Sequence, residues 1–136
     1  MLKIKICPAF MSQCDFEIKN NQFIVIKSSN SEYNDSSEAF HSELQSLEVF
    51  DELMTRMLSF ISNPSPKKII VIADGISIKI HYSNDEKNIE YELKSIQKDS
   101  KEMKFVHDFF DLSMDCIKND KLTTYLKEVK ENYLSQ

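Results

Sequence analysis

The chain has 136 residues, of which 41% are hydrophobic and 29% are charged, and its formal net charge is -5. This length and composition predict one globular domain over residues 1–136 and exclude an intrinsically disordered chain. The negative balance argues against nucleic acid or anionic lipid as the main partner and favours a basic surface.

No apolar run is long enough for a membrane-spanning helix. The first ten residues, MLKIKICPAF, alternate lysine with apolar residues, whereas a signal peptide has an unbroken apolar core. We therefore expect no membrane association and a cytoplasmic location. The cysteines Cys7, Cys14 and Cys116 contain no CxxC pair, which favours buried free thiols in a reducing compartment. A bridge between Cys7 and Cys14 is the alternative that their spacing leaves open.

The first third of the chain is typical of sheet. Residues 2–6 alternate between apolar and polar and predict a strand. Residues 16–19 and 23–27 predict a hairpin around Asn20 and Asn21, because asparagine tolerates the left-handed backbone of a tight turn. Residues 28–35 are rich in serine and asparagine and predict a loop.

A long helix is predicted next, from Asp35 to about Ser62, ahead of Pro64 and Pro66. Asp35 and Glu38 have the spacing of a capping box. Apolar residues recur at helical spacing in two adjacent rows: Phe40, Leu44, Leu47, Met54, Leu58 and Ile61 in one, and Val49, Leu53, Met57 and Phe60 in the other. Two rows make a wide apolar arc, which predicts a central helix with sheet on one flank and other helices on the other.

The segment KKIIVIADGISIKIHY predicts a second hairpin, with Asp74 and Gly75 at its turn. Gly75 is the only glycine, and it occupies a position that requires positive φ. A two-residue turn would pair Ala73 with Ile76, Val71 with Ile78 and Ile69 with Ile80. Residues 88–94 alternate again and predict the third strand of a meander.

Two helices are predicted at the carboxyl end. Asp99 and Glu102 have capping-box spacing before an aromatic amphipathic stretch that ends near Asn119. A final helix places Leu122, Leu126, Val129 and Tyr133 on one side. The predicted fold is therefore α+β, with an antiparallel sheet of N-terminal strands and the DG-hairpin meander packed against a long central helix and two C-terminal helices.

The chain carries no recognisable catalytic motif. A single glycine excludes the usual phosphate-binding loops, and His41, His81 and His107 are too far apart in sequence to suggest a metal cluster. We expect no cofactor, no metal, no catalytic residue and no enzymatic activity.

Residues 30–53 hold seven carboxylates and neither lysine nor arginine. On the predicted helix, His41, Gln45, Glu48 and Glu52 share one exposed face, whereas Glu43 and Asp51 fall beside the apolar arc and Arg56 pairs with Glu52. One interpretation is a solvated face that favours the helix dipole. The other is a surface that meets cations, because a merely soluble helix would intersperse lysines. On the second interpretation, the candidate partner-binding residues are Glu32, Asp35, Glu43, Glu48, Asp51 and Glu52.

Residues 69–82, 88–93 and 99–112 together resemble bacterial immunity proteins, the cytoplasmic antidotes of contact-dependent and type VI polymorphic toxins. The shared features are small acidic size, a strand-DG-strand hairpin, a following alternating strand and a Glu-capped aromatic helix. The resemblance implies a protein that binds one cognate toxin, such as a basic nuclease, with acidic side chains in place of nucleic-acid phosphates. The alternative is a small acidic secretion chaperone or adaptor that binds an effector segment along a groove or sheet edge. Neither hypothesis predicts the oligomeric state.

Overall fold

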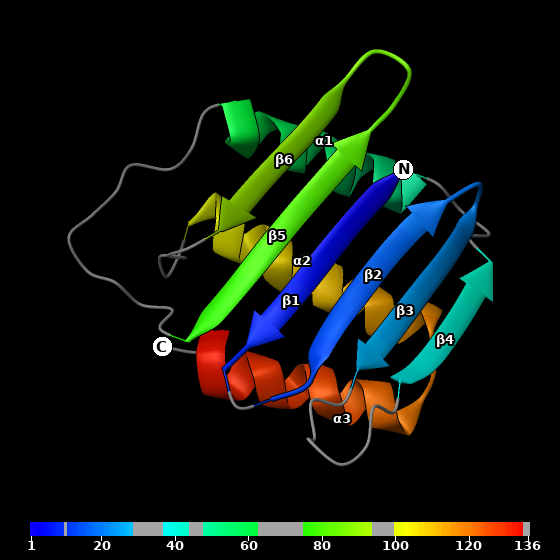
Figure 1. The fold of residues 1–136 in the computed structure, drawn as a ribbon, viewed down its shortest axis with the longest axis vertical. Coiled ribbons are helices and arrows are strands. Elements are labelled where there is room, and N and C mark those ends of the chain that lie inside the picture. The colour runs from blue at the N-terminus through cyan, green and yellow to red at the C-terminus, as the bar shows by residue number, and fades with distance from the viewer. Residues whose placement is uncertain (10, 29–36, 44–47, 63–74, 94–99, 135–136) are drawn as a thin grey trace. The chain divides into compact units, whose positions relative to one another are not determined.

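The computed structural model describes residues 1–9, 11–28, 37–43, 48–62, 75–93 and 100–134. The chain divides into two compact units, each made from two separate segments. Unit 1 comprises Met1–Gln45 and Gly75–Lys94, and unit 2 comprises Ser46–Asp74 and Ser95–Gln136. The described strands belong to unit 1 and the described helices to unit 2 (Figure 1), so the predicted α+β class is confirmed. The single domain stays a prediction.

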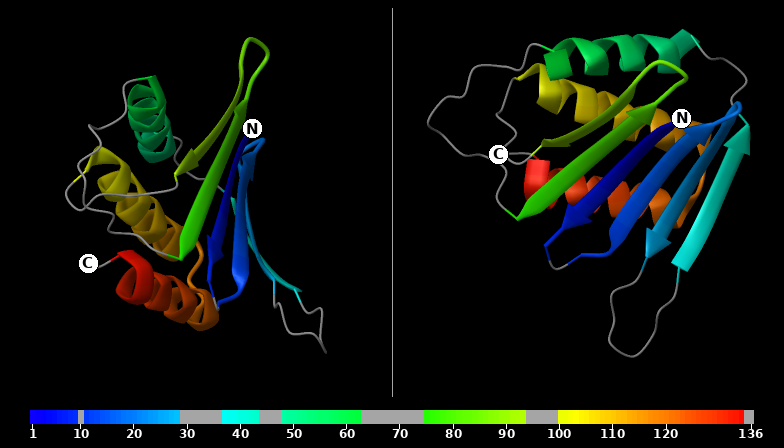
Figure 2. Two further views of the ribbon diagram at one scale, coloured as in Figure 1. Left: turned by 60° about the vertical axis from the view of Figure 1, so that its left-hand side comes forward. Right: turned by 45° about the horizontal axis from the view of Figure 1, so that its top comes forward.

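Unit 1 is one antiparallel sheet with the strand order β4-β3-β2-β1-β5-β6 (Figure 1). Its strands are β1(Leu2–Pro8), β2(Gln13–Lys19), β3(Gln22–Ser28), β4(Ser37–Glu43), β5(Ile76–Ser83) and β6(Asn88–Leu93). The first strand of the chain lies at the centre, where Ile4 is opposite Phe16 of β2 on one side and Ile80 of β5 on the other. Figure 2 shows the twist that accumulates across the six strands.

The two faces of the sheet differ because side chains alternate along each strand. One face carries the buried apolar residues: Leu2, Ile4, Ile6, Cys14, Phe16, Phe23, Val25, Phe40, Ile76, Ile78, Ile80 and Leu93. Phe16 and Phe23 stack there with their ring centroids 6.2 Å apart. The other face of β1 carries Lys3 and Lys5, both exposed.

The hairpin between β2 and β3 confirms the turn predicted at Asn20 and Asn21. Both asparagines have positive φ, 52° and 62°, and Lys19 pairs with Gln22 across them. Two consecutive left-handed residues match the right-handed twist of the flanking strands. This turn sets the register that places Phe16 opposite Val25.

The helix predicted from Asp35 is wrong over residues 37–43, which form β4. β4 pairs with β3 along its whole length, and Phe40 lies opposite Val25 on the buried face. Sequence periodicity fitted Phe40 into a helical row, but strand pairing on the open edge of β3 outweighed that weak local signal. The helix that was predicted from Asp35 begins at Glu48, and Asp35, Leu44, Gln45 and Leu47 lie outside the described residues.

The pairs predicted for Ile78 and Ile80 in the DG hairpin are wrong, although the left-handed glycine is confirmed, with φ 84° at Gly75. β5 pairs with β1 along one edge and, from Ile78 onward, with β6 along the other. Neither edge leaves room for the predicted pairs of Ile78 and Ile80 with residues 71 and 69, which lie outside the described residues. The meander of β5 and β6 is confirmed.

Unit 2 contains α1(Glu48–Ser62), α2(Lys101–Cys116), α3(Asp120–Val129) and η1(Lys130–Leu134), a π-helical turn. α2 contacts both α1 and α3. Phe60 of α1 meets Phe105 of α2 edge to face, with ring centroids 5.2 Å apart. The buried row of α1 is Phe50, Leu53, Met57 and Phe60. Met54, Leu58 and Ile61, from the other predicted row, are half-buried.

Polar caps position both C-terminal helices. Ser100, not Asp99, caps α2, and its hydroxyl accepts a hydrogen bond from the Met103 N–H at 3.1 Å. The predicted box was therefore one residue out of register; Asp99 lies outside the described residues. Asn119 caps α3 by accepting from Lys121 and Leu122 N–H groups at 3.0 and 3.3 Å.

Candidate functional site

The structure separates the acidic residues that the sequence placed on one helix. Glu43 is exposed on β4 in unit 1, whereas Glu48, Asp51 and Glu52 are on α1 in unit 2. Glu32 and Asp35 lie outside the described residues. The predicted helical face running from His41 to Glu52 is therefore wrong, because His41 belongs to a strand.

Glu48, Asp51 and Glu52 form a compact group, which we call the acidic patch of α1. Their spacing of i, i+3 and i+4 puts the three carboxylates on adjacent positions of the helix surface. All three are exposed, and within the described part of the chain none of their carboxylates forms an ion pair. Asp51 was predicted beside the apolar arc together with Glu43. Both carboxylates are exposed, so neither needs a cation to offset burial of its charge.

Arg56 does not pair with Glu52 as the sequence suggested. Its guanidinium binds the Asp108 carboxylate of α2 at 2.8 Å, which ties α1 to α2. A similar ion pair joins Lys130 to Asp111 at 2.8 Å. The base nearest to the acidic patch along α1 is thus engaged elsewhere, so the patch is more negative than predicted. Part of this acidity has a structural role, because carboxylates in the first turn of a helix favour its dipole.

A second charged surface lies on the exposed face of the sheet, and the sequence reasoning missed it. We call it the charged sheet face, and its eight charged or titratable residues come in pairs, one pair on each of four adjacent strands. The pairs are Asp15 and Glu17 on β2, Lys3 and Lys5 on β1, Lys79 and His81 on β5, and Glu90 and Glu92 on β6.

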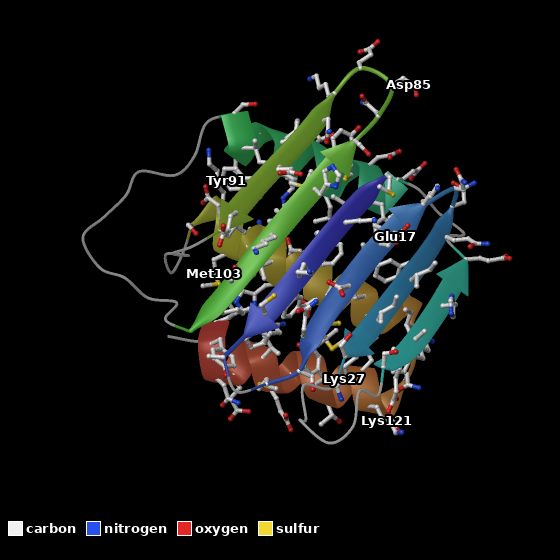
Figure 3. All side chains as sticks on the ribbon, viewed as in Figure 1. Glu17, Lys27, Asp85, Tyr91, Met103 and Lys121 are labelled. Atoms are coloured by element: carbon white, nitrogen blue, oxygen red, sulfur yellow. The ribbon has the colours of Figure 1, made fainter. Side chains whose placement is uncertain are left out.

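The strand register arranges these side chains in two parallel rows. In one row Lys3 lies between Glu17 and His81, and His81 in turn is opposite Glu90. In the second row, Lys5 lies between Asp15 and Lys79, and Lys79 is opposite Glu92. Each row therefore reads acid, lysine, base, acid across the sheet. Figure 3 labels Glu17, the acid of the first row on β2.

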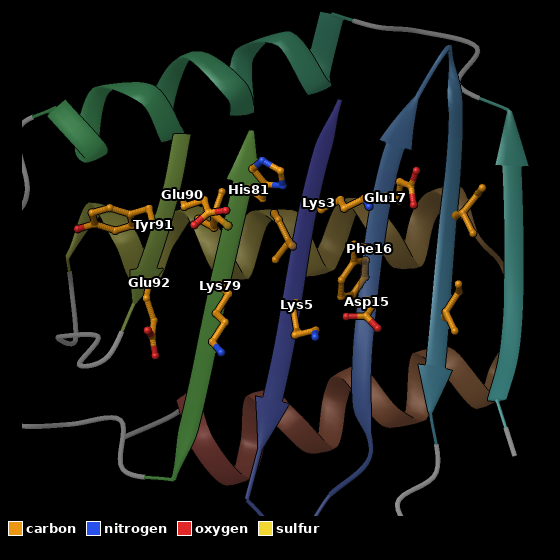
Figure 4. A pocket seen from close by; sticks show the side chains of 14 residues that line it. Lys3, Lys5, Asp15, Phe16, Glu17, Lys79, His81, Glu90, Tyr91 and Glu92 are labelled. Carbon is orange, nitrogen blue, oxygen red and sulfur yellow. The ribbon is translucent and has the colours of Figure 1, made fainter. Parts of the chain in front are cut away.

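The charged sheet face is hollowed into a pocket of about 790 Å³ within unit 1 (Figure 4). Lys3, Lys5 and Lys79 lie over its middle strands, and Ile24 and Ile26 of β3 extend the lining beyond the acids of β2. Two hydrogen bonds order its β5–β6 side. His81 Nε2 lies 2.7 Å from Asn88 Oδ1, and the Ser77 hydroxyl donates to Glu92 at 3.1 Å.

Part of this surface could have been predicted from the sequence. Each of the four strands carries two like-charged or basic residues at i and i+2, which is the spacing of one face of a strand. The order of the strands could not have been predicted, because the pairing of β5 with β1 joins segments that lie far apart in the chain.

The cysteines are free thiols, as predicted, but burial is confirmed only for Cys14, because Cys7 and Cys116 are half-buried. Cys14 lies opposite Ile6 on the buried face, so the adjacent Cys7 points to the other face and the alternative bridge does not form. Burial, followed by the charge of Asp15, raises the pKa of the Cys14 thiol. Burial also raises the pKa of Cys116. Neither change produces the low pKa of a reactive cysteine.

Within the described ranges, no group of three His, Cys, Asp or Glu side chains is arranged to hold a metal ion. None of the helices there has the length and hydropathy needed to cross a bilayer. Comparison with known proteins finds no family model that matches the chain and no similar curated protein. The resemblance to immunity proteins therefore stays a hypothesis, and functional inference starts from the two charged surfaces.

Proposed function

We propose that the protein is a cytoplasmic immunity protein, which binds and neutralises a cognate bacterial toxin with a basic surface and performs no catalysis itself. The toxin class that best fits is a basic nuclease, and the contact is the acidic patch of α1. The observation that supports this proposal is the group Glu48, Asp51 and Glu52, exposed and without ion pairs among the described residues.

Such a patch suits a nuclease inhibitor for an electrostatic reason. A nuclease presents lysine and arginine side chains to the phosphates of its substrate, and closely spaced carboxylates offer these cations an alternative anionic surface. Opposite charges also steer the two proteins together and raise the association rate by about tenfold or more at low salt. Salt screens this attraction over about 10 Å at 0.1 M.

The alternative, a secretion chaperone or adaptor, requires apolar surface to hold an effector segment. In the described part of the chain, the exposed large hydrophobic residues are Met1 and Ile26, with 36% and 37% of their surface accessible. Two scattered residues are much less than the contiguous apolar patch of a groove binder. Electrostatic recognition is therefore the better supported mode.

The proposal is tested by capture from a lysate of the native host at low and high salt, followed by nuclease assays of the bound protein. We expect a basic protein whose activity falls stoichiometrically on addition of the wild-type chain. The double variant Glu48→Lys/Glu52→Lys should bind it at least tenfold more slowly. The matched control is Asp115→Lys/Glu128→Lys, which changes the charge equally at exposed sites of α2 and α3.

Circular dichroism of both variants checks that the helices remain folded, since Glu48 also favours the dipole of α1. Unchanged association by Glu48→Lys/Glu52→Lys, or an equal loss in the control, would remove the acidic patch from the mechanism. Retention of the partner at high salt with no change in its activity would instead support the adaptor.

A further inference from the structure

We propose that the charged sheet face is a second docking surface, which takes an extended acidic segment of a protein partner along β1 and β5. The proposal concerns unit 1 alone and does not depend on the acidic patch of α1. Its central observation is the cationic block at the middle of the pocket, where Lys3 lies opposite His81 and Lys5 lies opposite Lys79.

Each lysine of this block has a carboxylate opposite it on one neighbouring strand, but one pair within the block is unfavourable. Lys5 and Lys79 are directly opposite each other, and like charges in that relation destabilise a sheet. Neither these ammonium groups nor that of Lys3 forms an ion pair or hydrogen bond within the described part of the chain. All three lysines are exposed over the pocket, so their charges are available to an incoming anion (Figure 4).

The acids on either side of the block limit what can bind. Asp15 and Glu17 border it on β2, and Glu90 and Glu92 border it on β6. With strands about 4.8 Å apart, the cationic block is two strands wide and the acidic borders are only about 14 Å from each other. A duplex nucleic acid would lay phosphates over these acids and be repelled. One narrow polypeptide segment avoids them.

The spacing of the block selects the segment further. Residues i and i+2 on one face of a strand are about 6.6 Å apart, so Lys3 and Lys5 match two carboxylates at alternate positions of an extended segment. Basic side chains at the edges of that segment would meet the acidic borders. Beyond the border on β2, Ile24 and Ile26 offer an apolar contact, and Ile26 is 37% exposed. The predicted partner motif is therefore acidic at every second residue.

The test uses two capped peptides, Glu-Ser-Glu-Ser-Glu and Lys-Ser-Lys-Ser-Lys, titrated at low ionic strength into the full chain labelled with ¹⁵N. We expect the acidic peptide to shift amide resonances of β1 and β5. Lys5→Gln/Lys79→Gln should weaken its binding at least tenfold. Lys104→Gln/Lys127→Gln, a matched change at exposed lysines of α2 and α3, should leave binding unchanged.

An absence of shifts on β1 and β5, an equal loss in the control variant, or preferential binding of the lysine peptide to the sheet would each overturn the proposal. The same titration also tests the acidic patch of α1 separately from the charged sheet face. The lysine peptide should shift α1 in the wild type and lose that effect in Glu48→Lys/Glu52→Lys. Failure of that second result alone counts against the immunity mechanism and leaves the sheet surface intact.

Discussion

Raising the pH above 9 should lower the free energy of unfolding through Cys14. This thiol is buried in β2 opposite Ile6. Burial is the main reason that its pKa is raised from the ordinary 9.0; the charge of Asp15 adds to the effect and Lys27 opposes it. Folding therefore keeps a proton on Cys14 that the unfolded chain releases.

The sign and size of the effect follow from this difference in bound protons. Below pH 9 the thiol is protonated in both states, and the full stability is present. Above pH 9 the unfolded state binds fewer protons than the folded state, so the free energy of unfolding falls as the pH rises. One titrating group contributes about 1.4 kcal/mol for each pH unit, which means a loss of roughly 1.4 kcal/mol at pH 10.

The assay is urea unfolding of the wild type and Cys14→Ala at several pH values from 7 to 10. The substitution lowers stability at every pH because it leaves a small cavity, at a cost of about 1 kcal/mol or more. Its curve should fall less steeply than that of the wild type above pH 9, since the titrating thiol is gone. Parallel curves up to pH 10 would show that Cys14 ionises equally in both states and would refute the reasoning.

Two further predictions concern unit 2. Phe60→Ala should destabilise the protein by about 3 kcal/mol or more in urea unfolding, because Phe60 is buried and meets Phe105 edge to face. Phe60→Leu should cost less, and a loss under about 1 kcal/mol for the alanine variant would contradict the packing. Asn119→Ala should cost about 1 kcal/mol by removing the cap of α3. Asn119→Asp, which keeps an acceptor oxygen, should restore most of it, and equal losses for both would exclude capping.

Local signals in the sequence were enough where a short segment decides its own structure. Asn20 and Asn21 adopt left-handed backbone for steric reasons that act within the turn itself. The apolar row of α3 likewise predicted its buried residues Leu122, Leu126 and Val129. These elements needed no knowledge of the rest of the chain.

Prediction failed where distant segments decide the outcome. Phe40 fitted a helical row, but the open edge of β3 determined that residues 37–43 form a strand. Ile78 looked like part of a local hairpin, yet its partners are Ile6 and Leu93. The charged sheet face was not predicted for the same reason, because Lys5 lies opposite Lys79 only when β1 and β5 are neighbours.

The central position of β1 has a consequence for biosynthesis. Its second neighbour, β5, follows in the chain only after β2, β3, β4 and α1. Before β5 is synthesised, a nascent chain can form the four strands β1 to β4. The edge of β1 that later pairs with β5 is then unpaired, beside the apolar side chains Leu2, Ile4 and Ile6. Unpaired strand edges beside apolar surface promote aggregation. We therefore expect aggregation of this protein to start from chains in which β5 has not yet paired with β1.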